Sequence, residues 1–194
     1  MDIRNLGTIT PLGQILQVNN ALVTDVFFRS RTTGHLDILY ANEQNKTISQ
    51  SLRLHVSLYT DILNSLGEHM CLCDIQEGML IDSLFSPIME RRDPPQANAY
   101  LIIARESGQP SLNTTTKQIA KVDMVNFIFY TGDPDNIEDQ IKFNVRSTTT
   151  ILDKNGNPLP FRSLRPDLLV NVTHSNVQTR DSSRQAEAFH IQLL

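Results

Sequence analysis

The stretch HMCLC, from His69 to Cys73, comes closest to a chemical site in this 194-residue chain. Alternate side chains of a strand share a face, so an extended backbone would align His69, Cys71 and Cys73. Imidazole and thiolate are ligands that Zn²⁺ and Cu(I) accept. Because the chain has no further cysteine and a bridge between the two would be strained in an extended strand, we interpret them as reduced surface thiols. A metal site is the alternative, and we predict no cofactor.

A second candidate is the acidic segment GDPDNIEDQ at residues 132–140. Carboxylate and amide oxygens spaced in this way can hold Ca²⁺. The segment lacks the glycine at the sixth position and the glutamate at the twelfth that complete a calcium-binding loop. We therefore predict a solvated loop here.

The elements that must position such residues occur twice in the chain. Residues 52–104 match residues 141–193 at a shift of 89 without a gap. About eleven positions are identical, where chance would supply roughly three, and self-similarity of this kind indicates repeated structural units. We interpret the repeat as an internal duplication.

The match continues upstream at a different shift, because QILQV at 14–18 resembles QIAKV at 118–122. This alignment gives the first copy about 15 additional residues, which we place near 29–50. The polar stretch between the copies lacks periodicity and reads as a linker. The predicted organisation is a first repeat at 1–104, a linker at 105–117 and a second repeat at 118–194.

Alternation of apolar and polar residues is the dominant pattern in both copies. Ile141, Phe143 and Val145 alternate with polar residues, which predicts a strand with one buried face, and VDMVNFIFYT at 122–131 reads as another strand. Asn155-Gly156 favours a tight hairpin turn. Each copy contains about five short strands, so we predict an all-β protein of two tandem small antiparallel β-barrels, OB-like or SH3-like.

The segment PFRSLRPD, the following HSNVQTR and the phrase QAEAF in the second copy resemble uncharacterised bacterial proteins built from tandem small β-barrel repeats of OB-like type. The resemblance covers the second copy and, more weakly, the first. It implies the fold and no activity.

Two histidines of the second copy could serve catalysis. His174 aligns with Phe85 of the first copy, which predicts a packed, hydrogen-bonded side chain. His190 is opposite in phase to its neighbours Phe189 and Ile191, so we expect it on the solvent-facing or second face. The chain contains no Gly-rich phosphate loop, nucleophile elbow or HExxH motif, and we predict that it is not an enzyme.

Nearly the same phrase occurs at 91–102 and 180–191, as RRDPPQANAYLI and RDSSRQAEAFHI. In each we expect a loop followed by a closing strand, whose aromatic residue and isoleucine face away from its two alanines. The retained polar residues are candidate binding residues, namely Arg91, Gln96, Arg180 and Gln185.

We predict a non-catalytic binding or assembly module whose partner is a protein, another copy of this chain or a different one. The apolar run MLIDSLFSPIM at 79–89 supplies the expected contact surface, and a homo-oligomer is one such assembly. The alternative is single-stranded nucleic acid or glycan binding on a barrel face, with a patch joining Arg146, Arg162 and Arg165 to exposed aromatics. The net charge of −4 makes nucleic acid unfavourable. Without an apolar leader or membrane span, we predict a cytoplasmic location.

Overall fold

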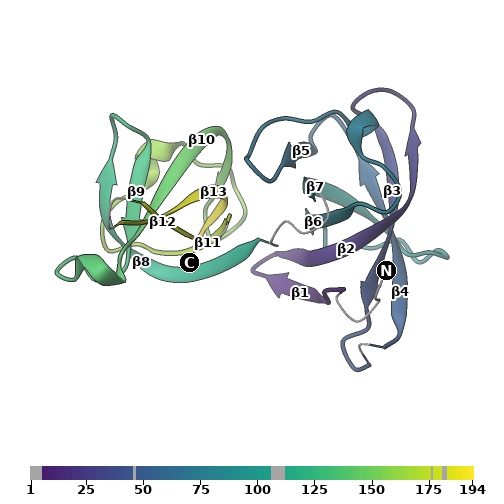
Figure 1. Cartoon of the computed structure of the whole chain (residues 1–194), viewed down its shortest axis with the longest axis horizontal. Helices are drawn as coiled ribbons and strands as arrows, with labels where there is room; N and C mark the ends of the chain where they lie inside the picture. The colour runs from purple at the N-terminus through teal and green to yellow at the C-terminus, as the bar shows by residue number, and fades with distance from the viewer. Residues whose placement is uncertain (1–5, 46, 106–111, 176, 181–182) are drawn as a thin grey trace. The chain divides into compact units, whose positions relative to one another are not determined.

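The computed structural model describes residues 6–45, 47–105, 112–175, 177–180 and 183–194. The chain divides into two compact units, Met1–Ser111 and Leu112–Leu194, which are drawn in Figure 1. Strands dominate both units, and the described residues contain no α-helix, only short 3-10 turns. This confirms the predicted all-β class.

The first unit is a closed barrel with two additional strands. Its strands are β1 (Ile9–Leu12), β2 (Ile15–Phe28), β3 (Gly34–Ala41), β4 (Ser49–Val56), β5 (Asp61–Asn64), β6 (Leu80–Phe85) and β7 (Gln96–Arg105). Strands β2, β3, β4, β7 and β6 pair in that order, and β6 pairs with β2 again, which closes the ring. The β4–β7 pair is parallel and the other pairs of the ring are antiparallel. We call this unit barrel 1.

The second unit, barrel 2, closes along the same path. Its strands are β8 (Asn113–Asp123), β9 (Ile128–Thr131), β10 (Ile141–Leu152), β11 (Leu169–His174), β12 (Gln178–Arg180) and β13 (Ser183–Leu193). The ring runs β8, β9, β10, β13, β11 and back to β8, again with one parallel pair, β10 with β13. Strand β8 begins within the segment 105–117 that the sequence indicated as a linker.

The two barrels keep the same strand register at the shift of 89. Leu54 pairs with Ala97 in barrel 1, and Phe143 pairs with Ala186 in barrel 2. Strands β6 and β11 have matching limits at this shift. The turn glycines also match, because Gly67 and Gly156 both adopt positive φ, at 78° and 86°, a backbone conformation that glycine adopts without a steric penalty.

The upstream alignment was wrong. Leu22 pairs with Leu80 and Gln118 pairs with Leu169, so Gln118 corresponds to Leu22 and not to Gln14. The additional residues of barrel 1 are three in the β2–β3 hairpin and four between β3 and β4, instead of about 15 together. Strand β2 is 14 residues long, and a period of two fits such a strand at several registers.

A turn interrupts the stretch 122–131 that was predicted as one strand. The Asp123 carboxylate accepts the backbone N–H groups of Val125 and Asn126, each at 3.1 Å. Phe127 then adopts a φ of 54°. The stretch is therefore the β8–β9 hairpin, and an aspartate that caps its own turn explains the reversal.

Each barrel has its own apolar core, built from the inward residues of the alternating strands. In the closing strands, the alanines and the isoleucine share the core face, contrary to the expectation. The pairing of β6 with β7 skips Tyr100, and that of β11 with β13 skips Phe189. A β-bulge at this position in both copies moves the aromatic side chain off the alternation.

Candidate functional site

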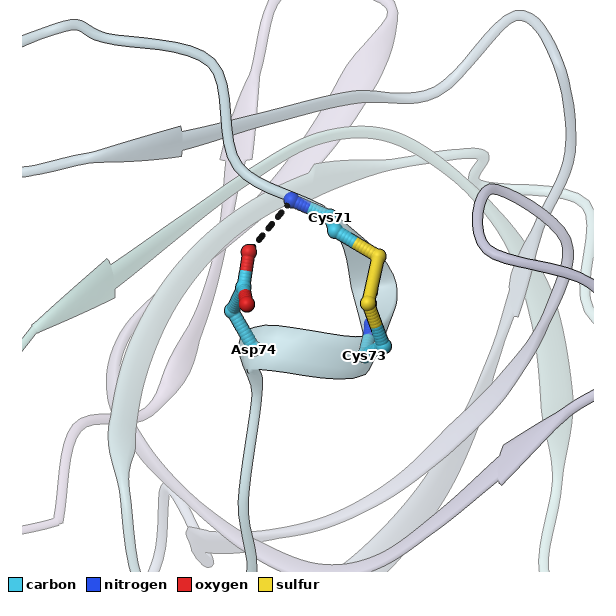
Figure 2. Close-up of side chains that lie close together, drawn as sticks. All are labelled: Cys71, Cys73 and Asp74. Atoms are coloured by element: carbon cyan, nitrogen blue, oxygen red, sulfur yellow. Dashed lines mark hydrogen bonds between the residues drawn. A yellow bond between two sulfur atoms is a disulfide. The ribbon is translucent and has the colours of Figure 1, made fainter.

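The two cysteines lie in a turn and are bonded to each other. Cys71 and Cys73 form a disulfide at the 3-10 turn Leu72–Asp74, as Figure 2 shows, with their Cα atoms 5.0 Å apart. The Asp74 carboxylate accepts the Cys71 N–H at 2.9 Å. An extended strand would separate these Cα atoms by about 6.6 Å, so the turn brings the two side chains within reach of a bridge. The prediction of reduced thiols on a strand is wrong in this structure.

The disulfide also bears on the alternative hypothesis of a metal site at His69, Cys71 and Cys73. The group of ligand types that converges here is Cys71, Cys73 and Asp74, and it does not include His69. Metal ions bind thiolates, and both sulfur atoms are bonded to each other. His69 lies instead opposite Leu63 in an isolated backbone bridge.

The acidic segment at 132–140 is a hydrogen-bonded loop whose oxygens serve its own backbone. Asp133 accepts the N–H of Asp135 at 2.9 Å, and Asn136 accepts that of Glu138 at 3.1 Å. Lys117 forms an ion pair with Asp139 at 2.5 Å, and this pairing lowers the pKa of Asp139. The side-chain oxygens of Asp133, Asn136 and Asp139 are thus engaged in contacts of the protein itself.

His174 is a packed core residue, as predicted. Its Nδ1 donates to the Ser175 carbonyl at 2.6 Å, and its Nε2 lies 2.8 Å from the Thr115 hydroxyl. The ring packs on Phe143 with centroids 5.0 Å apart. Burial lowers the pKa of His174, so the imidazole is neutral at neutral pH.

His190 lies in β13 and is 3% exposed. Neither ring nitrogen has a hydrogen-bond partner among the described residues. Burial lowers the pKa of His190 to about 4. Its matched position in barrel 1 is Leu101, where no polar atom has to be accommodated.

The candidate binding residues of the repeated phrase are in different settings. Gln96 is 8% exposed and accepts a hydrogen bond from His55 Nε2 at 2.9 Å. This bond joins strands β7 and β4 of barrel 1. Arg91 is exposed and Gln185 is half-buried on β13. Arg180 lies in β12, and its side chain is outside the described part of the structure. Gln96 thus has a structural role in barrel 1, and binding by Arg91, Arg180 and Gln185 stays a prediction.

A row of ring side chains, Phe27, His35 and His55, crosses strands β2, β3 and β4 of barrel 1 on their outer face. Cross-strand pairing places Phe27 opposite His35 and His35 opposite His55. The Phe27 and His35 rings stack with centroids 4.9 Å apart, and the two histidine rings meet edge to face at 6.3 Å. We call these three residues the ring row.

A bidentate ion pair between Arg53 and Asp37 lies beside the ring row. Arg53 donates to both carboxylate oxygens of Asp37 at 2.7 Å, and this hydrogen bonding lowers the pKa of Asp37. Partial burial, and then the charge of Arg53, lower the pKa of His35. His35 is therefore neutral at neutral pH, next to a fixed pair of opposite charges.

Large apolar side chains are exposed at the adjoining end of barrel 1. Phe28 pairs with Gly34, and Gly34 pairs with Val56, which leads directly into the loop carrying Leu58 and Tyr59. Phe28, Leu58 and Tyr59 are 55%, 77% and 92% exposed. We call these three residues the end patch. The sequence pattern did not indicate the end patch, and the run 79–89 that was predicted as the contact surface is largely strand β6 and core.

Barrel 2 has a pocket of about 430 Å³ at the corresponding end. Its lining residues are Phe127, Val145, Arg146, Ser147, Thr149, Ile151, Leu159, Pro160 and Phe161. The rings of Phe127 and Phe161 have centroids 5.3 Å apart. Thr149 supports the rim, because its hydroxyl donates to the Ala188 carbonyl at 2.7 Å and accepts the Arg146 N–H at 2.9 Å. We call this feature the mouth pocket.

Of the basic residues expected in a nucleic-acid patch, Arg146 lines the mouth pocket and forms an ion pair with Glu187 at 2.8 Å. Arg162 and Arg165 are exposed in and just after the 3-10 turn Phe161–Ser163. Arg146 shares the pocket lining with the exposed Phe127, and Arg162 directly follows the lining residue Phe161 in the chain. The pairing with Glu187 leaves little excess positive charge at Arg146 to attract phosphate groups.

No protein-family model matches the chain, and no match is found among the curated proteins. Within the described residues, no helix has the length and apolar character to cross a bilayer. The class that the fold and surfaces define is a small all-β protein of two closed barrels with separate candidate binding surfaces.

Proposed function

We propose that both barrels are OB-like and that they arose by duplication. The support is the common strand path, in which the third and fifth strands of each ring pair in parallel. Matched side chains also repeat their roles, because Thr60 bonds the Ala99 carbonyl as Thr149 bonds that of Ala188. OB-like barrels serve as binding scaffolds for varied ligands.

We propose that the protein is a non-catalytic module that binds protein, and that a second copy of this chain is its simplest partner. The observation that carries this proposal is the end patch, where three large apolar side chains are more than half exposed on adjoining segments. Aromatic residues of this kind are enriched at the centres of protein interfaces. His174 and the acidic loop are engaged in internal contacts, which supports a role without catalysis.

Sedimentation velocity across about 1–100 µM tests this proposal. We expect association beyond the 21.9 kDa monomer, weakened about tenfold or more by Tyr59→Ser, because an interface tyrosine of this kind contributes about 2 kcal/mol. Ile88→Ser is the matched control, since Ile88 is exposed but outside the end patch. A strict monomer at every concentration would overturn self-association through the end patch.

A second candidate function is oligosaccharide binding on the ring row. The observation that favours it is the stacked Phe27–His35 pair beside the Arg53–Asp37 pair, on a strand face that OB-like barrels use for ligands. A glycan array probed with the protein and with Phe27→Ala tests it, and we expect binding that the substitution abolishes. Retention on single-stranded DNA that falls with added salt would instead favour nucleic acid.

A further inference from the structure

The two barrels differ at the end where the mouth pocket lies, because the hairpin there is three residues longer in barrel 1. We propose that the mouth pocket of barrel 2 binds an extended peptide segment of a partner protein, with one large apolar side chain of that segment inserted between Phe127 and Phe161. This inference rests on the proposed protein-binding function and assigns it a second site, separate from the end patch.

Barrel 1 shows what covers this position when the chain supplies the cover itself. Leu72 matches Phe161 at the shift of 89 and is fully buried. The longer β2–β3 hairpin passes over it, and the Arg31 carbonyl accepts the Leu72 N–H at 2.9 Å. Gly34 permits the close approach, because a Cβ there would lie 2.0 Å from the Phe27 carbonyl oxygen and 3.0 Å from a Leu72 methyl group. The turn of the β2–β3 hairpin thus closes the mouth of barrel 1 with a backbone carbonyl that bonds the Leu72 N–H.

Barrel 2 has the same frame without that cover. Its β8–β9 hairpin is three residues shorter, Phe127 is 54% exposed and Phe161 is half-buried. The Phe161 N–H corresponds to the Leu72 N–H, yet within the described part of the chain no acceptor faces it. An apolar pocket with an unused backbone donor at its edge fits a peptide, whose carbonyl can bond the N–H while its side chain fills the space.

The lining defines the chemistry of the peptide. Val145, Ile151 and Leu159 add apolar lining to that of the two phenylalanines, which suits a leucine, methionine or aromatic side chain. The exposed Arg162 directly follows Phe161, so a carboxylate close to the anchoring residue adds an ion pair at the rim. The expected ligand is therefore an apolar anchor within an acidic segment.

Selection from a random dodecapeptide library displayed on phage, with the full chain as target, tests the proposal. We expect the recovered peptides to share a large apolar residue with nearby Asp or Glu. A synthetic copy of the most enriched peptide is then titrated into the ¹⁵N-labelled chain. The Phe161 amide proton should move downfield as it gains an acceptor.

Matched substitutions in the two barrels identify the site. Ser147→Trp places a large ring over the mouth pocket at an exposed position, and we expect it to weaken peptide binding at least tenfold. Leu66→Trp introduces the same ring at an exposed position of barrel 1 that lies outside the end patch, and it should leave peptide binding unchanged. Circular dichroism and thermal unfolding establish that both variants fold, and Phe161→Ala provides a second loss of the pocket wall if Ser147→Trp does not fold.

Several outcomes would overturn the inference. These are a selection that enriches no peptide, equal binding to Ser147→Trp and the unchanged chain, or a Phe161 amide that does not respond. Each of them leaves the sedimentation test of the end patch intact, because that test reads self-association. Conversely, a strict monomer that still binds acidic, apolar peptides through the mouth pocket would refute only the end patch.

Discussion

Replacing His190 by leucine should stabilise the protein and flatten its pH dependence. Leucine is the residue at the matched position in barrel 1, Leu101, and it removes two buried ring nitrogens that lack partners among the described residues. The imidazole has a pKa of about 4 in the folded chain, against 6.5 as its ordinary value. The unfolded chain therefore binds more protons between these pH values, and the free energy of unfolding falls as the pH drops below 6.5.

The magnitude follows from that difference in pKa. The titration of His190 lowers the free energy of unfolding by about 3 kcal/mol at strongly acid pH, and about 2 kcal/mol of this loss is already present at pH 5. Urea unfolding of the unchanged chain and of His190→Leu, at about pH 8 and pH 5, measures it. The variant should lose about 2 kcal/mol less over this interval, whereas His69→Leu, at an exposed histidine, should behave like the unchanged chain. An equal loss in the unchanged chain and His190→Leu would refute the reasoning.

Two further changes test the interior of barrel 1 and the cysteine turn. Asp82→Asn should reduce the free energy of unfolding by about 3 kcal/mol, because it weakens the buried ion pair with Arg105. Asp37→Asn changes the more exposed ion pair with Arg53 and should reduce it by under about 1 kcal/mol. Equal losses for the two variants in urea unfolding would contradict this difference. For Cys71 and Cys73, a thiol-reactive reagent should label the unfolded, unreduced protein at neither sulfur, and labelling of both would show the thiols to be free. Reduction should lower stability by no more than about 2 kcal/mol, since the bridge closes a very short loop.

The strand content of both barrels could be predicted because period-two patterns report directly on burial. Ile141 and Phe143 are buried as their alternation indicated. The sequence match at a shift of 89 allowed the same strands to be predicted in residues 52–104. The upstream register could not be settled in the same way. Alternation specifies which face a residue occupies and leaves the position along a long strand open.

Features that depend on turn conformation could not be predicted from the sequence pattern. The segment from His69 to Cys73 has the alternation of a strand. Its tight turn depends on hydrogen bonds such as the one that the Asp74 carboxylate accepts from the Cys71 N–H. The Asp123 turn was hidden in an apolar stretch in the same manner. The end patch carried no signal, since exposed apolar residues resemble core residues in composition.

The path of each ring sets the order in which the chain can complete its barrels during synthesis. The strand that closes each ring lies between the third and fourth strands, yet it is the last of the five in sequence. Barrel 1 therefore cannot close until β7 has left the ribosome, and all five strands of its ring are then present. At about 5–20 residues per second, the remaining strands emerge seconds later. The first barrel can thus finish folding while the second is still an open, unpaired set of strands on the translating ribosome.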